Sequence, residues 1–248
     1  MMDYQAPQDL LRQKVILVTG AGAGIGRVAA TTFARYGATV ILLGRTTAKL
    51  EAVYDEIVAA GGPQPGIAPM DLAGASNDDM RQFAEVLANT YGRLDGLLHN
   101  AAQLGERIPV EHYDVSKWMT VMQVNFNAVF MLTRQLLPLL RQSAAASLVF
   151  TSSSVGANPK AYWGPYAVSK YAMEGLAKLL AEELENTSTV RVNILNPGAT
   201  RTPMRATAYP NENPATVKPA ASLMPLYLYL MGDASIGVNG QTLRCQLP

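Results

Sequence analysis

The segment GPYAVSK places a tyrosine and a lysine, Tyr166 and Lys170, four residues apart and directly after a Gly-Pro pair. The residues from Tyr166 onward, YAVSKYAMEGLAKLLAEEL, carry apolar side chains at helical spacing. Residues four apart on a helix share a face, so the phenol and the ammonium would lie next to each other. Because a nearby ammonium favours phenolate, the pattern indicates an acid-base site at the start of a helix.

A second pair of the same spacing shows that the pattern alone does not identify a site. Tyr113 and Lys117 stand in YDVSK, which shares four of its five residues with YAVSK. A Tyr-x-x-x-Lys match is therefore weak evidence until its surroundings are known.

The elements that must position these residues alternate along the chain. Short apolar or β-branched runs predict buried strands, and the stretches between them have helical periodicity. Strands are expected at 15–19, 39–43, 94–99, 147–152 and 190–195, with weaker ones near 66–70 and 240–245. Two of the helices contain the periodic sets that begin at Leu50 and Met80, with Thr46 or Thr47 and residues 76–78 as N-caps.

This alternation predicts an α/β fold with a doubly wound, Rossmann-like parallel sheet of seven strands and helices on both faces. No segment resembles a linker, so residues 1–248 are expected to form a single domain. Prolines recur among small and polar residues over 198–222, which predicts a mobile loop over a substrate site.

The first strand leads into a glycine-rich turn, VTGAGAGIGR at 18–27. Its glycines would let the backbone turn tightly and approach a pyrophosphate at the N-terminus of the next helix. The spacing is Thr-Gly-x-x-x-Gly-Ile-Gly, because Ile25 and Arg27 stand where Gly-x-Gly-x-x-Gly would end. Close helix-strand packing is the alternative use of such glycines, but the strand-turn-helix setting favours a nucleotide site.

From about Lys14 to Arg244 these motifs follow the order and separations of one family, and the chain resembles the short-chain dehydrogenases/reductases. Residues 19–26 resemble its cofactor turn, HNAA at 99–102 its Asn-Asn-Ala-Gly element, and NPGATRT at 196–202 its Pro-Gly segment. LLHNAA, TSSSVG and WGPYAVSK most resemble a bacterial group of YciK-like oxidoreductases. The positions that match the family's catalytic set are Asn125, Ser153, Tyr166 and Lys170.

The resemblance separates the two Tyr-x-x-x-Lys pairs. Ser153 precedes Tyr166 by thirteen residues, as in the family, whereas Asn100 stands thirteen residues before Tyr113. We therefore interpret Tyr113 and Lys117 as a solvated helix start.

The resemblance also implies roles and an NAD(P) site. Tyr166 would be the general acid/base, Lys170 would hydrogen-bond the nicotinamide ribose, and Ser153 would bind the substrate oxygen. Asn125 would position a water that connects Lys170 to solvent, and no metal is implied. The implied cofactor contacts are Gly20, Ala23, Gly24, Ile25, Gly26, Arg45, Thr46, Asp71, Leu72, Asn100, Ala101, Ala102, Tyr166, Lys170, Pro197, Gly198 and Thr202.

Several of these assignments have structural alternatives. Ser152 and Ser154 compete with Ser153, although alternation along a strand end points them away from it. Asn125 has the common alternative of a buried asparagine that bridges helices, and Asp71 that of a turn aspartate.

Tyr166 needs a lowered pKa to work near neutrality, because a free phenol with a pKa of about 10 is a poor proton donor or acceptor there. Lys170 together with a cationic nicotinamide ring is expected to supply the roughly 4 kcal/mol that this takes.

Cofactor choice depends on LLGRTT at 42–47. The strand ends in Arg45 without an acidic residue, which favours the 2′-phosphate of NADP(H) over NAD(H). A solvated helix start is the alternative for Arg45, and the glycine turn has Ala23 where many NADP-specific relatives have a basic residue. Ala102 stands where the family has glycine, which adds a methyl group close to the cofactor.

The composition bounds the remaining functions. The chain of 248 residues is 49% hydrophobic and 16% charged, with a formal net charge of +1 and no basic run, so nucleic-acid and membrane partners are not expected. One cysteine and two histidines offer no metal cluster. No signal-like or transmembrane-length apolar segment occurs, so we expect a cytoplasmic protein.

The predicted function is an NADP(H)-dependent oxidoreductase that interconverts a carbonyl and an alcohol. A nucleotide-binding sensor without significant catalysis is the alternative. The apolar segment SLMPLYLYLMG at 222–232, with the family's helix pairing between subunits, predicts a homodimer or homotetramer. The residues that match the family's substrate pocket suggest a bulky apolar or aromatic carbonyl compound, although each also fits a core or interface role: Leu104, Tyr162, Trp163, Met204 and Tyr209.

Overall fold

All seven predicted strands form one parallel sheet in the computed structural model, which describes residues 3–245. Its order is β3-β2-β1-β4-β5-β6-β7, and each neighbouring pair is parallel. The predicted α/β fold class is confirmed, while positions 1–2 and 246–248 of the predicted domain lie outside the described residues. The strands are β1 (Val15–Thr19), β2 (Thr39–Gly44), β3 (Gly66–Pro69), β4 (Gly96–His99), β5 (Ser147–Thr151), β6 (Arg191–Asn196) and β7 (Thr242–Arg244).

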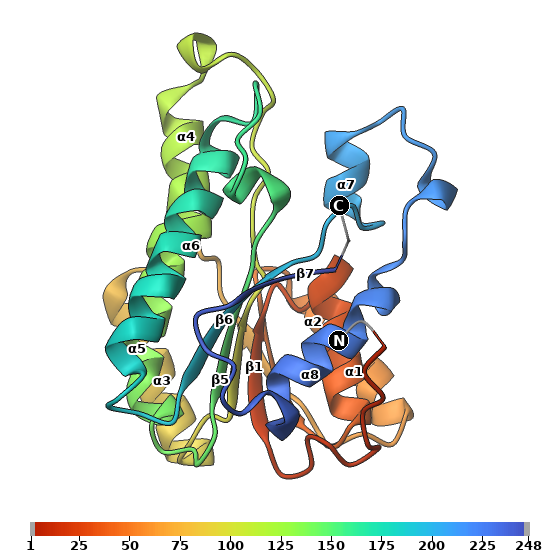
Figure 1. Cartoon of the computed structure of the whole chain (residues 1–248), viewed down its shortest axis with the longest axis vertical. Coiled ribbons are helices and arrows are strands. Elements are labelled where there is room, and N and C mark those ends of the chain that lie inside the picture. The colour runs from red at the N-terminus through yellow and green to blue at the C-terminus, as the bar shows by residue number, and fades with distance from the viewer. Residues whose placement is uncertain (1–2, 246–248) are drawn as a thin grey trace.

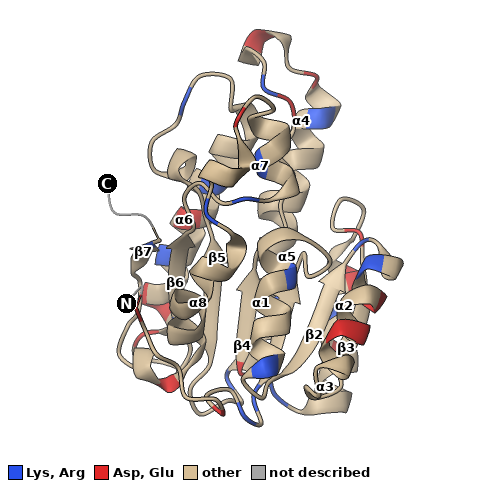
Figure 2. Cartoon of the chain, turned by 90° about the vertical axis from the view of Figure 1, so that its right-hand side faces the viewer, with Lys and Arg blue, Asp and Glu red and all other residues tan. Residues whose placement is uncertain are grey.

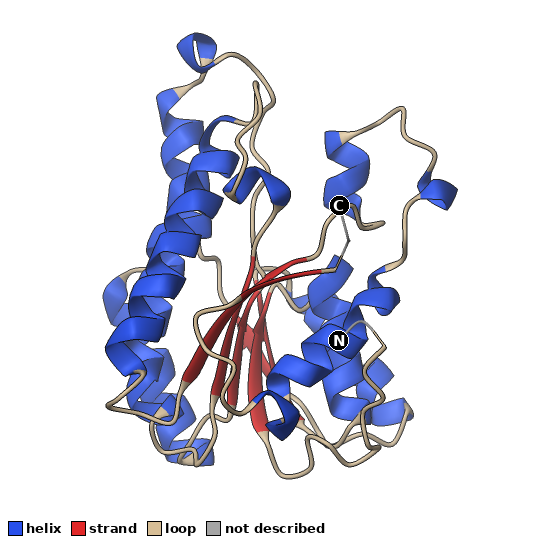
Figure 3. Ribbon diagram, in the orientation of Figure 1, coloured by secondary structure: helices blue, strands red, loops and turns tan. Residues whose placement is uncertain are grey.

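Helices cover both faces of the sheet (Figure 1). One face packs against α3, α5 and α6 and the other against α1, α2 and α8, through two separate hydrophobic clusters. Figure 3 shows the strands running together between these two helical layers. The helices are α1 (Gly24–Arg35), α2 (Thr47–Ala59), α3 (Asn77–Tyr91), α4 (Val115–Met122), α5 (Ala128–Leu140), α6 (Gly164–Leu184), α7 (Pro203–Ala208) and α8 (Met224–Met231).

The helices that follow β1, β2 and β3 differ in how their first turns are capped. Ser76 caps α3 as predicted, and with Asp79 it forms a capping box that satisfies two backbone N–H groups. Thr46 is the N-cap of α2, but its side chain makes no capping hydrogen bond, and neither does Ala23 before α1. The starts of α1 and α2 both lie at the carboxyl ends of the strands, where their first N–H groups remain available to a ligand.

The segment predicted as a loop over 198–222 is partly helical. Thr202 caps α7 by accepting from the backbone N–H of Arg205 at 3.1 Å, and Pro203 occupies the first turn. Its mobility remains a prediction.

The apolar segment 222–232 forms α8 and packs inside its own subunit. Tyr227 and Leu230 are fully buried in the cluster that α8 shares with α1. The segment is therefore not a solvated helix, as its composition predicts, and the predicted homo-oligomer stays a prediction.

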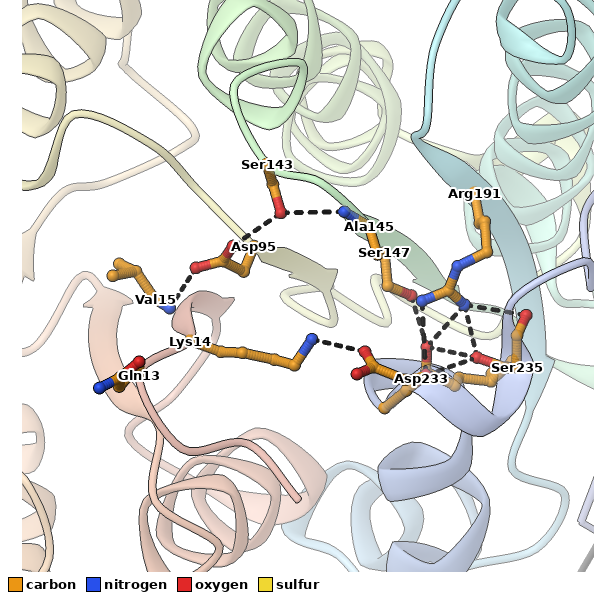
Figure 4. Close-up of polar contacts among 12 residues, drawn as sticks. Gln13, Lys14, Val15, Asp95, Ser143, Ala145, Ser147, Arg191, Asp233 and Ser235 are labelled. Carbon is orange, nitrogen blue, oxygen red and sulfur yellow. Dashed lines mark hydrogen bonds and ion pairs between the residues drawn. The ribbon is translucent and has the colours of Figure 1, made fainter. Parts of the chain in front are cut away.

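A buried polar network closes the amino ends of the strands, opposite the uncapped helix starts (Figure 4). Asp95 accepts from the backbone N–H of Val15 at 2.8 Å and from Ser143 Oγ at 2.6 Å. The guanidinium of Arg191 donates to carbonyl groups around Ser235, and its burial lowers its pKa. These contacts fix the strand ends and leave the other end of the sheet to bind ligands.

Between residues 3 and 245, none of the helices has the length and apolar character needed to cross a bilayer.

Candidate active site

A cleft of about 340 Å³ opens at the carboxyl ends of the strands, beside the neighbours β1 and β4. The chain crosses from the β3 edge of the sheet to β4 at this point, which is the topological switch point where open α/β sheets bind ligands. Most of the predicted cofactor contacts line this cleft: Gly20, Ala23, Gly24, Ile25, Arg45, Thr46, Asp71, Leu72, Asn100, Ala101, Ala102, Tyr166, Lys170, Pro197 and Thr202.

The glycine turn has a backbone that other residues would not adopt easily. Gly20 has φ 70° and Gly24 has φ 56°, both in the left-handed region. A Cβ on Gly20 would stand 2.9 Å from the Cα of Ala101, so the turn packs directly on the loop after β4. The cradle fits the pyrophosphate of a dinucleotide, since the helix start beyond it is uncapped.

Two of the predicted cofactor residues have a different place. Gly26 is buried behind the turn, where a Cβ would stand 2.3 Å from the oxygen of Gly20, so it serves close helix-strand packing. Gly198 has φ 64° and turns the chain between Pro197 and the cleft-lining Thr202 without lining the cleft itself.

Thr19 joins the glycine turn to the loop after β4, a role that the sequence did not reveal. Its Oγ1 accepts from the backbone N–H groups of Asn100 and Ala101, both at 3.0 Å, and contacts the oxygen of Leu98 at 3.3 Å. Asn100 in turn donates from Nδ2 to the oxygen of Thr19 at 3.3 Å. The two walls of the cleft are thus fixed relative to each other.

Two cations without a carboxylate partner among residues 3–245 line the end of the cleft near β2. Arg45 and Lys49 are exposed and make no ion pair there, and no acidic residue occupies the first turn of α2. Sequence reasoning missed Lys49, although its spacing of four residues from Arg45 was visible. Together with the uncapped start of α2 they form a site suited to a phosphate.

The adenine end is less specific. Asp71 and Leu72 line the cleft as expected, and Asp71 Oδ1 also accepts from the backbone N–H of Ala73 at 3.1 Å. The turn role considered for Asp71 is therefore present beside its position in the cleft.

Tyr166 and Lys170 lie on the first turns of α6 and both face the cleft. Lys170 is only 3% exposed, and its Nζ donates to the oxygen of Thr151 at 2.7 Å. Its Nζ lies 5.8 Å from the centroid of the Tyr166 ring. Burial lowers the pKa of Lys170 to about 8, against a smaller opposing effect of Glu174.

Of the three serines after β5, Ser153 is the one whose hydrogen bond to Tyr166 affects the phenol. Ser152 is buried and donates to the carboxylate of Glu174, while Ser154 is exposed in the turn that follows. Ser152 lines the cleft but is paired with Glu174, and Ser153 is the serine that interacts with Tyr166.

The pKa of Tyr166 differs from the sequence-based expectation. Burial of the phenol raises its pKa, and the hydrogen bond from Ser153 lowers it by a smaller amount. The expected lowering by Lys170 is not seen in the chain alone, because Lys170 donates to Thr151 and lies beside the ring of Tyr166.

Asn125 lies in a π-helical turn, Gln123–Asn127, between α4 and α5. Its Oδ1 accepts from the backbone N–H of Gln103 at 2.7 Å, and its Nδ2 donates to the oxygen of Gln103 at 2.9 Å and to Ser169 Oγ at 3.0 Å. The side chain is 1% exposed and is used for bridging. The structural alternative therefore describes the side chain, which does not line the cleft.

The second Tyr-x-x-x-Lys pair lies at the start of α4, away from this cleft. Lys117 is exposed as predicted and pairs with Glu106 at 2.5 Å. The solvated interpretation was wrong for Tyr113, which is 8% exposed and whose hydroxyl accepts from the backbone N–H of Glu106 at 2.8 Å.

The predicted substrate residues gather on one side of Tyr166, with one exception. Four of them pack in a small apolar cluster with Tyr166: Leu104, Trp163, Met204 and Tyr209. Tyr162 is 55% exposed and has φ 70°, so it points to solvent from a strained turn.

Comparison with known proteins gives consistent matches. Residues 14–213 match the family model described as short chain dehydrogenase. The chain is 53% identical to the "Uncharacterized oxidoreductase YciK" of Escherichia coli K12 over 99% of this chain and 96% of that protein.

Two similar crystal structures contain a nucleotide. A short chain dehydrogenase from Shigella flexneri complexed with NADP is 51% identical, with a TM-score of 0.95, over 97% of this chain and 100% of the other. One from Escherichia coli CFT073 complexed with NADPH is 53% identical, with a TM-score of 0.94, over 97% of this chain and 100% of the other.

Proposed function

Because the chain belongs to the short-chain dehydrogenase/reductase family and to its YciK-like group, we propose that it is an NADP(H)-dependent oxidoreductase that interconverts a carbonyl and an alcohol. The observation that carries this proposal is that Tyr166 and Lys170 both line the cleft, with Lys170 Nζ 5.8 Å from the centroid of the phenol ring and Ser153 beside the phenol. These three side chains supply a proton donor, a hydrogen-bond donor for the substrate oxygen and a buried cation in one place.

The chain's own residues perform the proton chemistry. A bound nicotinamide cofactor supplies the hydride that adds to the carbonyl carbon. Tyr166 gives the phenolic proton to the oxygen, which becomes the alcohol hydroxyl, and Ser153 donates a hydrogen bond to that oxygen while negative charge develops on it. The lowered pKa of Lys170 suits its ammonium to exchange a proton near neutral pH.

The test replaces the phenol and leaves the cleft intact. Tyr166→Phe should reduce turnover of aldehydes and ketones by about 10²–10⁴ while the dissociation constant for NADPH stays within about threefold. A panel of aliphatic and aromatic carbonyl compounds, followed by NADPH absorbance, measures this. Full activity of the variant would contradict the role of Tyr166, and tight NADPH binding without any turnover by the wild type would favour the sensor alternative.

NADP(H) preference rests on Arg45, Lys49 and the uncapped start of α2. The two nucleotide-bound relatives support the same preference. Fluorescence titration should show NADPH binding at least about tenfold tighter than NADH, or roughly 1.4 kcal/mol. Arg45→Gln and Lys49→Gln should each reduce this ratio, whereas the control Lys178→Gln, an exposed lysine of α6, should not. Equal binding of both nucleotides would remove the two cations from the site.

A homodimer or homotetramer and a cytoplasmic location complete the proposal. Cys245 is a buried free thiol, which agrees with a reducing compartment. Exposed apolar side chains on α5 and α6, including Phe130 and Tyr171, supply the face for subunit contact.

A further inference from the structure

The exposed side chain of Arg107 lies against two neighbouring aromatic rings, beside the apolar cluster that contains Tyr166. Its Cζ is 4.8 Å from the ring centroid of Trp163 and 5.1 Å from that of Tyr209, and we call these two rings the aromatic clamp. Its Nη1 also donates to the backbone oxygen of Ala208, the last residue of α7. The loop after β4, the start of α6 and the end of α7 thus together fix one guanidinium.

The second Tyr-x-x-x-Lys pair holds the residue just before Arg107. Tyr113 binds the backbone N–H of Glu106, and Lys117 binds its carboxylate. The ring of Tyr113 packs edge to face on Trp118, with 5.7 Å between centroids. The pair thus anchors the chain segment that carries Arg107.

Two acidic side chains on the segments around Arg107 are already paired with other cations. Glu106 pairs with Lys117, and Glu212 receives two hydrogen bonds from Arg205 at 2.7 and 2.5 Å. Within residues 3–245, Arg107 has no carboxylate at ion-pair distance. Figure 2 shows Lys and Arg segments in blue at α4 and α7, with Asp and Glu segments in red on the chain around them. A guanidinium has five N–H donors, so Arg107 keeps donors for a ligand.

The aromatic clamp connects Arg107 to the proton donor. The ring centroid of Trp163 is 5.7 Å from that of Tyr166, and both rings pack in the same apolar cluster. One aromatic ring therefore separates the guanidinium from the phenol. Contact with the two rings orients the guanidinium, which remains exposed and therefore accessible to an anion.

We propose that Arg107 binds a carboxylate of the substrate, so that the enzyme acts on carbonyl or alcohol compounds whose acidic group lies about one ring width from the reacting carbon. This inference rests on the proposed oxidoreductase function. The planar fork of Arg107 matches a carboxylate in two parallel hydrogen bonds, and the apolar cluster around Tyr166 accepts the ring or chain between the two groups.

The experiment compares 4-oxocyclohexane-1-carboxylate with its methyl ester, two compounds that differ in charge at the same distance from the ketone. Calorimetric titration of the NADP-loaded protein gives the affinity of each, and NADPH consumption gives each kcat/KM. We expect the acid to exceed the ester by about tenfold or more in both quantities. Arg107→Gln should remove this preference, and Arg107→Lys should retain part of it.

Lys160→Gln is the matched control, because it removes an exposed charge from the loop before α6 without touching the aromatic clamp. This variant should keep the full preference for the acid. The ratio of acid to ester corrects for any loosening of α7 in Arg107→Gln, since such loosening affects both compounds.

The outcomes separate the two proposals. Equal affinity for acid and ester, no binding of either, or a preference that survives Arg107→Gln would overturn the role of Arg107 and restrict it to holding α7. Absence of turnover of any carbonyl compound, with the binding preference intact and dependent on Arg107, would instead overturn the oxidoreductase function and leave Arg107 as a ligand-binding residue.

Discussion

The phenol of Tyr166 is subject to two opposing effects, since burial raises its pKa and the hydrogen bond from Ser153 lowers it. Removing the hydrogen bond leaves burial alone, so Ser153→Ala should move the basic form of Tyr166 to higher pH. In alcohol oxidation, the rising limb of kcat/KM against pH should then shift to higher pH, and the maximal rate should fall. Ser154→Ala, which changes an exposed neighbour, should leave the limb in place. A limb that moves to lower pH would contradict the assignment.

Burial of the charged ammonium of Lys170 lowers the free energy of unfolding of the chain. Its pKa of about 8 lies below the ordinary value of 10.5, so the unfolded chain binds its proton more tightly than the folded chain. Stability from this group is therefore smallest below pH 8 and increases as the pH rises from about 8 toward 10.5.

Lys170→Met should remove this dependence from the protein without nucleotide. At pH 7 the variant should unfold with a free energy equal to or greater than that of the wild type, by up to a few kcal/mol, because it avoids burying a charge. The advantage should shrink as the pH is raised to 9.5. Denaturant unfolding at both pH values measures the difference, with the exposed Lys178→Met as the control. A variant that loses stability equally at both pH values would contradict the desolvation argument.

At the scale of elements, the π-helical turn between α4 and α5 holds the loop after β4. Asn125 uses its amide to satisfy both backbone groups of Gln103, which lines the cleft. Because a buried backbone group without a partner costs about 1–3 kcal/mol, this single side chain determines the conformation of one cleft wall.

Asn125→Ala should lower the free energy of unfolding by about 1–3 kcal/mol and weaken NADPH binding. Asn125→Asp keeps the acceptor for the N–H of Gln103 and loses the donor to its oxygen. Thermal unfolding of both variants, combined with nucleotide titration, tests the bridge. Unchanged stability of Asn125→Ala would show that another group satisfies Gln103.

Helix α7 also contacts the loop after β4. Its last residue and the following Tyr209 bind Arg107, while Arg205 stacks at 3.7 Å on the ring of Tyr209. Loops predicted from proline content can become ordered when tertiary contacts of this kind supply partners.

At the scale of the whole molecule, the layer of α5 and α6 carries three exposed large apolar side chains. Phe130 of α5 is 47% exposed, and on α6 Tyr171 is 56% and Leu179 55% exposed. We propose this layer as the surface that contacts another subunit.

The double variant Phe130→Glu/Tyr171→Glu should therefore dissociate the oligomer at micromolar concentration, because it places charges in an apolar contact. Light scattering of the wild type and the variant measures the mass of each. Val58→Glu, at an exposed position of α2 on the other layer, should leave the oligomer intact. A wild type that is monomeric at all concentrations would contradict the proposal of a homo-oligomer.

The sequence by itself determined the seven strands, their parallel pairing and a nucleotide site after the first strand. Buried strands and amphipathic helices leave local periodic patterns that make this possible. The resemblance to the family, and not the Tyr-x-x-x-Lys spacing alone, indicated Tyr166, Lys170 and Ser153. Only the tertiary structure decided what depends on contacts between distant segments. Asn125 bridges Gln103, Tyr113 supports the chain before Arg107, and α8 is internal. Partners far apart in the chain carry no spacing signal, so such roles become visible only when the fold brings them together.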